Sequence, residues 1–295
     1  MQVAIHPAVN SPAVFNANLL CAERVSGPLS LGQLVSGLRQ RLFFQARHTQ
    51  YLMLDSAGND RATLDAVADH LAFGIDPSRV VLFEPSRVAE FAALRDTLAG
   101  LSKAPTPAMA TTVALAALRP ALISSHAATA TDVAAANAVV REVNARAGQA
   151  VLSEARPLFS ESAPFAPPRV ALDVPFSTDP ATLAAVIDAL PASSMLGLPE
   201  RTVEGNPLFQ LLDVFERDLP FLDDLKSKFR RGGLSERVIK LHLADCTERV
   251  LAPLRERRNE LLADQMALQA VLEEGMEKAR RAAAQTLDQL RGVLA

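Results

Sequence analysis

The 295-residue chain is poor in the residues that define several protein classes. Its two cysteines, Cys21 and Cys246, are too few for the disulfide framework of a small secreted domain. No apolar run approaches the roughly 18 residues of a membrane-spanning helix, and the N-terminus lacks a basic segment followed by an apolar one. We therefore expect a cytoplasmic protein without membrane association.

Aromatic residues and net charge are also scarce. Tryptophan is absent, aromatic residues make up 5% of the chain, and the net charge is -3, so no overall basic field attracts DNA. Hydrophobic residues reach 49%, mostly aliphatic, which is enough for a sizeable core rich in helices. Residues 226–295 hold 14 basic and 10 acidic residues, so this end of the chain carries a modest positive charge.

Short apolar runs alternate with helical periodicity in the first third of the chain. Asn18 to Glu23, Tyr51 to Leu54 and Val80 to Phe83 predict buried strands. Leu31 to Ala46 and Thr63 to Phe73 predict helices between them. Strands joined by crossovers of this length form a parallel sheet, so the pattern predicts an open α/β fold.

The rest of the chain has mainly helical periodicity. Pro120 interrupts one predicted helix and should kink or end it. Pro157 to Pro175 is proline-rich and is our candidate domain boundary, and every segment after Asp179 indicates helix. We predict an N-terminal arm at residues 1–17, a Rossmann-like domain at 18–178 and an all-helical domain at 179–295.

The common catalytic motifs are absent. The chain has no G-x-G-x-x-G, no phosphate-binding G-x-x-x-x-G-K-S/T loop, no G-x-S-x-G and no H-E-x-x-H. His242 and Cys246 are four residues apart on a predicted helix and could share a metal ion, but no second ligand pair accompanies them. The sequence favours ordinary packing for both residues and predicts no metal site.

A strand, a turn and a helix follow one another between Cys21 and Leu38. This segment resembles the opening of the tryptophanyl-tRNA synthetases, class I enzymes in which a strand runs into the turn S/T-G-x-L-H-L-G-H. The matching residues are Ser26, Gly27, Leu29, Leu31 and Gly32.

Two further blocks extend the resemblance from about Leu19 to the C-terminus in the family's order. They contain Gly74, Asp76, Pro77, Phe83, Ser86, Val88, Glu90 and Leu94, and then Pro253, Arg255, Glu256, Arg257, Gly275, Lys278, Ala279 and Thr286. The resemblance implies an α/β fold: a Rossmann-like parallel-sheet domain of the class I synthetase type, followed by an all-helical domain like the one that binds the anticodon. It also implies a homodimer.

The positions at which the family binds ATP are altered. Ser30 and Gln33 stand where the family's two histidines donate to ATP phosphates, and no lysine lies between Lys103 and Lys226, where its Lys-Met-Ser-Lys-Ser loop belongs. The free N–H groups of the helix N-terminus would bind an anion only weakly without those histidines. We expect ATP binding to be weak or lost and no cofactor to be needed. The remnant nucleotide-site positions are Arg24, Ser26, Gly27, Ser30, Gly32, Gln33 and Asp132.

The positions implied for the amino-acid pocket are altered as well. The family's helix Y-P-V-L-M-A-A-D corresponds to Thr111 to Leu118, so Leu115 and Leu118 are the remnants of the pocket. Leu118 replaces the aspartate that accepts the indole N–H. Leaving that donor unpaired costs roughly 1–3 kcal/mol, which removes much of the selectivity for tryptophan.

Three hypotheses follow from the resemblance. The first is a pseudoenzyme that binds tRNA or aminoacyl-tRNA, with contacts at Arg249, Arg255, Arg257, Arg258, Arg280 and Arg281. The second is an enzyme that takes aminoacyl-tRNA as acyl donor, with Cys21, Ser26 or Ser30 as nucleophile. The third is a divergent active synthetase in which Arg24, Arg47 or Arg169 replaces the lost positive charges.

Overall fold

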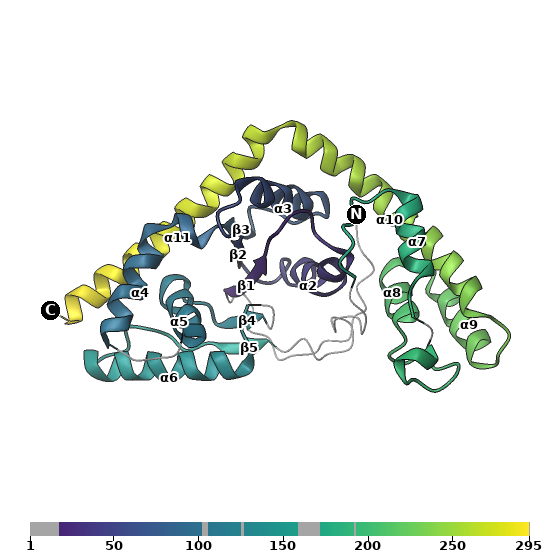
Figure 1. Ribbon diagram of the computed structural model, residues 1–295. Coiled ribbons are helices and arrows are strands. Elements are labelled where there is room, and N and C mark those ends of the chain that lie inside the picture. The colour runs from purple at the N-terminus through teal and green to yellow at the C-terminus, as the bar shows by residue number, and fades with distance from the viewer. Residues whose placement is uncertain (1–17, 102–105, 125–126, 159–171, 192, 295) are drawn as a thin grey trace. The chain divides into compact units, whose positions relative to one another are not determined.

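The computed structural model describes residues 18–101, 106–124, 127–158, 172–191 and 193–294 (Figure 1). The predicted arm at residues 1–17 and most of the proline-rich connector lie outside the described residues. The described part of the chain divides into two compact units. We call residues 18–27, 41–158 and 261–294 the sheet unit, and residues 28–40 and 172–260 the helical unit. The domain boundary expected after residue 178 stays a prediction.

A five-stranded parallel sheet forms the centre of the sheet unit, in the order β3-β2-β1-β4-β5. Its strands are β1 (Leu19–Arg24), β2 (Gln50–Asp55), β3 (Val80–Phe83), β4 (Leu122–Ser124) and β5 (Arg156–Leu158). The parallel α/β fold predicted from the sequence is therefore confirmed, and the first three strands lie where the apolar runs predicted them. The strand order switches sides at β1: β2 and β3 lie on one side of it, and β4 and β5 lie on the other. Ligands of such sheets bind at the carboxyl ends of the strands beside this switch point.

Helices cover the sheet and continue the chain beyond it. In the sheet unit these are α3 (Asp60–Ala72), the short 3-10 turn η2 (Pro85–Arg87), α4 (Ala89–Leu101), α5 (Thr106–Leu118), α6 (Ala130–Ala147) and α11 (Gln265–Leu294). The helical unit contains α1 (Leu31–Gln33), the π-helical turn η1 (Leu34–Leu38), α7 (Pro180–Asp188), the 3-10 turn η4 (Ser193–Leu196), α8 (Pro207–Phe215) and α9 (Leu219–Arg230). Both α2 (Arg39–Phe44) and α10 (Glu236–Ala263) run from one unit into the other.

Two sequence-based predictions needed correction. The helix predicted from Leu31 to Ala46 is interrupted by η1, because its backbone hydrogen bonds are wider than α-helical ones there. The segment expected to be helical on both sides of Pro120 is helical only before it. Helix α5 ends at Leu118, Arg119 has a positive φ of 47°, and the chain then enters β4.

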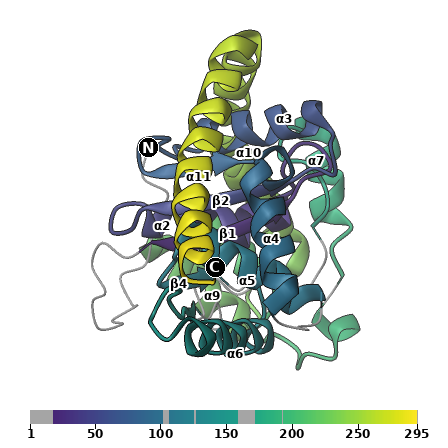
Figure 2. The same ribbon diagram turned by 90° about the vertical axis from the view of Figure 1, so that its left-hand side faces the viewer.

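Helix α11 completes the sheet unit. It packs against β3, the edge strand of the sheet, and against α3, α4, α5 and α6 (Figure 1 and Figure 2). Gly275 permits the close approach, because a Cβ atom at this position would overlap the carbonyl oxygen of Leu82 in β3. A helix over an edge strand shields its unpaired backbone groups. None of the described helices combines the length and apolarity needed to cross a bilayer.

Candidate functional site

The two residues that stand at the histidine positions lie just before and at the end of the short helix α1. Ser30 is the N-cap of α1: its Oγ accepts the backbone N–H of Gln33 at 3.3 Å. The side-chain oxygen of Gln33 accepts the backbone N–H of Ser30 at 2.9 Å in return. The two side chains therefore form a capping box, which satisfies the start of the helix with groups of the chain itself.

The remaining amides of this turn are bonded to a segment that follows the connector. The N–H groups of Leu31 and Gly32 donate to the carbonyl oxygens of Val174 and Leu172, both at 2.9 Å. In the opposite direction, the N–H of Phe176 donates to the carbonyl of Leu29 at 3.0 Å. A Cβ at position 32 would lie 3.4 Å from the Leu172 oxygen, which is ordinary van der Waals contact, so the approach does not require a glycine. The amides that an anion would need at this helix N-terminus are thus already bonded.

The other remnant nucleotide-site positions belong to the sheet unit. Asp132 forms a second capping box, with Thr129 at the start of α6, where its backbone N–H donates to Thr129 Oγ1 at 3.1 Å. Arg24 ends β1 opposite Asp55 of β2, and both residues are exposed. Ser26 is also exposed, and Gly27 follows it in the turn.

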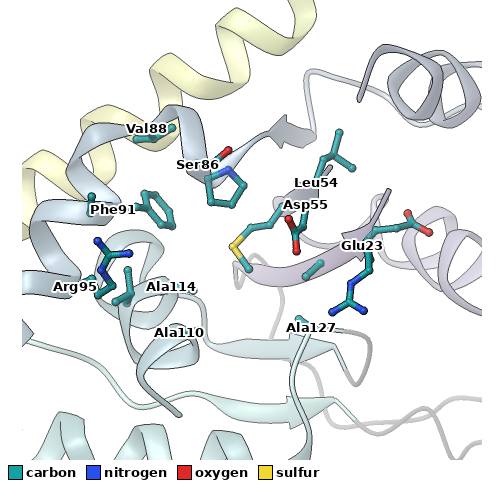
Figure 3. A pocket seen from close by; sticks show the side chains of 16 residues that line it. Glu23, Leu54, Asp55, Ser86, Val88, Phe91, Arg95, Ala110, Ala114 and Ala127 are labelled. Carbon is teal, nitrogen blue, oxygen red and sulfur yellow. The ribbon is translucent and has the colours of Figure 1, made fainter. Parts of the chain in front are cut away.

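A cavity of about 810 Å³ lies at the carboxyl ends of β1, β2 and β3 (Figure 3). The side chains of Asp55, Phe91 and Arg95 face it, whereas the Glu23 carboxylate points away (Figure 3). Leu115 and Leu118, the predicted pocket positions, are buried and do not line it. Helix α5 contributes Ala110, Val113 and Ala114 instead.

The sequence analysis missed a buried ionic cluster beneath this cavity, formed by Cys21, Glu23, Arg41 and His70. We call it the Glu23 cluster. Arg41 Nη1 donates to Glu23 Oε2 at 2.8 Å and lies 3.0 Å from His70 Nε2, and His70 Nε2 lies 3.2 Å from the same carboxylate oxygen. His70 Nδ1 donates to the carbonyl of Ala66 at 2.7 Å. Arg41 and Glu23 are at least 95% buried, so their charges depend on each other.

Cys21 is the fourth member of this cluster. Burial raises the pKa of its thiol to about 11, although the nearby Arg41 guanidinium lowers it in part. At neutral pH the sulfur is therefore a protonated thiol, which is a poor nucleophile. The signal that could have revealed the cluster is the presence of the charged Glu23 within a strand predicted to be buried.

A second group of the same residue types lies in the helical unit. Glu216, His242 and Cys246, which we call the Glu216 cluster, place their ligand atoms within 4.8 Å of one another. The sequence favoured ordinary packing for His242 and Cys246, and it gave no reason to connect them with Glu216.

The six arginines expected to contact tRNA are divided between the two units. Arg249, Arg255, Arg257 and Arg258 lie on α10 in the helical unit, and Arg280 and Arg281 lie on α11 in the sheet unit. Arg258 is buried, Arg255 pairs with Glu248, and Arg249 pairs with Asp245 at 3.1 Å. Arg280 and Arg281 both pair with Glu277, at 2.6 Å and 3.7 Å. Arg257 is exposed.

Comparison with known proteins agrees with this architecture, although no family model matches the chain. The chain is 26% identical to the tryptophan–tRNA ligase of Streptococcus pneumoniae serotype 4 over an alignment 332 positions long, which covers 94% of this chain and 97% of that protein. It is 28% identical to the tryptophan–tRNA ligase of Streptococcus agalactiae serotype V, with the same coverage.

Solved structures show the same fold. The tryptophanyl-tRNA synthetase of Campylobacter jejuni, solved with ADP and tryptophan, superimposes with a TM-score of 0.75 at 17% identity, over 92% of this chain and 98% of that one. Sequence similarity over nearly the whole length and the shared parallel-sheet fold lead to the same assignment. The chain is a homologue of the tryptophanyl-tRNA synthetases and has their class I fold.

Proposed function

We propose that this protein no longer activates tryptophan with ATP and acts by binding tRNA, aminoacyl-tRNA or a protein partner, as a homodimer. The observation that carries the proposal is the closed turn before α1. The side chains of Ser30 and Gln33 accept backbone N–H groups in a capping box, and the amides of Leu31 and Gly32 donate to the carbonyls of Val174 and Leu172. An ATP phosphate at this helix N-terminus would have to displace all of these bonds.

Electrostatics supports the same conclusion. Adenylation places developing negative charge on pyrophosphate, and the chain has no lysine between Lys103 and Lys226 to neutralise it. Ser30 and Gln33 are uncharged. The loss of one preorganised donor typically lowers a rate by about 10²–10³, and several losses together lower it further. Activity of this kind would need a different set of charges.

The geometry gives less support to the two alternatives. For acyl transfer, Cys21 is a buried thiol with a raised pKa and Ser30 is an N-cap, which leaves Ser26 as the exposed candidate nucleophile. For a divergent active synthetase, Arg47 lies over the Phe43 ring, 5.5 Å from its centroid, and Arg24 lines the cavity. Arg169 lies outside the described residues.

The decisive experiment is ATP–pyrophosphate exchange with each of the twenty amino acids. We expect no exchange above background, with the Streptococcus pneumoniae tryptophan–tRNA ligase as the positive control under identical conditions. Exchange with any amino acid would overturn the proposal in favour of an active synthetase.

Binding of total tRNA tests the second half of the proposal. We expect retention at low salt that weakens steeply as salt rises, because phosphate contacts release counterions. Arg257→Glu should weaken it, whereas Arg61→Glu, an exposed charge on α3 of the sheet unit, should not. If the wild-type protein retains no tRNA at low salt, a protein partner is the remaining ligand class.

A further inference from the structure

The Glu216 cluster brings together three potential metal ligands from two elements. Glu216 ends α8, and His242 and Cys246 lie one turn apart on α10. Glu216 Oε2 and His242 Nε2 are 2.6 Å apart, and all three ligand atoms lie within 4.8 Å of one another. Glu216 and Cys246 are buried, and the His242 side chain is 22% exposed.

The ligand atoms are held in place by contacts outside the cluster. Glu216 Oε1 accepts the backbone N–H groups of Arg217 at 2.8 Å and Asp218 at 2.9 Å, so Oε2 is the oxygen left to face His242. The Phe221 ring packs on the His242 imidazole with its centroid 5.0 Å away. Supporting contacts of this kind orient metal ligands and raise affinity.

The set of donor atoms selects a class of metal. One oxygen, one imidazole nitrogen and one sulfur are the ligand types of Zn²⁺, whereas Ca²⁺ and Mg²⁺ take oxygen ligands. Zinc bonds of about 2.0–2.3 Å place tetrahedral ligand atoms roughly 3.3–3.6 Å apart. To reach that spacing, the Glu216–His242 pair must open from 2.6 Å, and the Cys246 sulfur already lies within 4.8 Å of both atoms.

Space is available for a fourth ligand. A cavity of about 140 Å³ beside the cluster is lined by Glu216 and Cys246, together with Phe215, Arg217, Arg249 and Val250. Arg249 is paired with Asp245, which reduces its repulsion of a cation. Water or a small anion in this cavity would complete four-fold coordination. We propose that Glu216, His242 and Cys246 bind a Zn²⁺-like divalent transition metal, which joins the end of α8 to α10.

Metal binding has a chemical consequence at Cys246. The thiol donates to the carbonyl of Leu243 at 3.3 Å, and burial raises its pKa to about 12. A bound metal ion would displace this proton, so binding releases one proton per site from Cys246.

The two cysteines of the chain allow a matched test. We would titrate the metal-free full-length protein with Co²⁺ and record the near-ultraviolet cobalt–thiolate band and the visible bands of four-coordinate cobalt. Wild-type protein and Cys21→Ser should show both bands at one equivalent, and Cys246→Ser should lose the thiolate band. Zn²⁺ should then displace the cobalt.

Further variants keep the proposal falsifiable if Cys246→Ser does not fold. His242→Gln and Glu216→Gln should weaken Zn²⁺ binding by at least 10-fold in a competition assay with a chromophoric chelator, while circular dichroism stays unchanged. The proposal is wrong if the wild-type protein shows no cobalt–thiolate band. It is equally wrong if Cys246→Ser retains that band, or if His242→Gln and Glu216→Gln both bind Zn²⁺ as tightly as the wild type.

Discussion

The Glu23 cluster and the Glu216 cluster contain the same three residue types, a glutamate, a histidine and a cysteine, but they are neutralised differently. In the Glu23 cluster, the buried guanidinium of Arg41 contacts both the carboxylate and the imidazole. In the Glu216 cluster, the carboxylate is held by two backbone amides and by His242, beside a small cavity. The comparison teaches that an internal arginine makes the first cluster a structural element, whereas the second can accept a cation from outside.

The largest effect on stability should follow the removal of the buried Arg41 guanidinium. Arg41→Met leaves Glu23 buried without its partner, and breaking a buried pair in this way typically costs about 3–5 kcal/mol. Urea unfolding followed by circular dichroism measures the loss. Arg61→Met on the surface of α3, where Arg61 pairs with Asp65 one turn away, should change stability by less than about 0.5 kcal/mol.

Adding Glu23→Gln to Arg41→Met should recover part of the lost stability, because the unpaired charge is removed. If Arg41→Met unfolds at the same urea concentration as the wild type, the charges of the Glu23 cluster do not depend on each other and the comparison fails.

A smaller effect is expected in the other cluster when metal is absent. His242→Ala removes one hydrogen bond from Glu216, but the carboxylate keeps its two backbone donors and can be reached by water from the cavity. We expect a loss of about 1 kcal/mol in urea unfolding with a chelator present. A loss as large as that of Arg41→Met would show that the Glu216 cluster is also a closed structural element.

The smallest effect concerns chemistry rather than stability. Because Cys21 is buried and burial raises the pKa of its thiol, its alkylation at pH 8 should be at least about tenfold slower in the folded Cys246→Ser variant than in the same variant unfolded in urea. Mass spectrometry at short reaction times measures this rate. Equal rates in the folded and unfolded protein would mean that the thiol is not buried as the structure indicates.

The sequence predicted the parts of the fold that depend on local patterns. Apolar runs located β1, β2 and β3, and Pro120 located the end of α5. The three-residue strands β4 and β5 were missed, because a strand of this length has too few residues to show a period and is defined by its hydrogen bonds to neighbouring strands.

The candidate sites depend still more on long-range contacts. The resemblance directed attention to Ser30 and Gln33, but their mutual capping and the approach of Leu172 become visible only in the folded chain. Glu23 pairs with residues 18 and 47 positions away, and Glu216 with one 26 positions away. No local period or motif marks such pairs, so a single sequence does not predict them.

The packing of α11 on β3 affects how the protein is made. The ribosome synthesises α11 after every other described element of the sheet unit, and the described helical unit from residue 172 to residue 260 is translated between β3 and α11. During that interval the β3 edge lacks the helix that shields it, and uncovered strand edges pair readily with other chains. Residues 172–260 are thus an insertion in the sheet unit, and the time taken to translate them adds to the interval in which the β3 edge of the growing chain is exposed to aggregation.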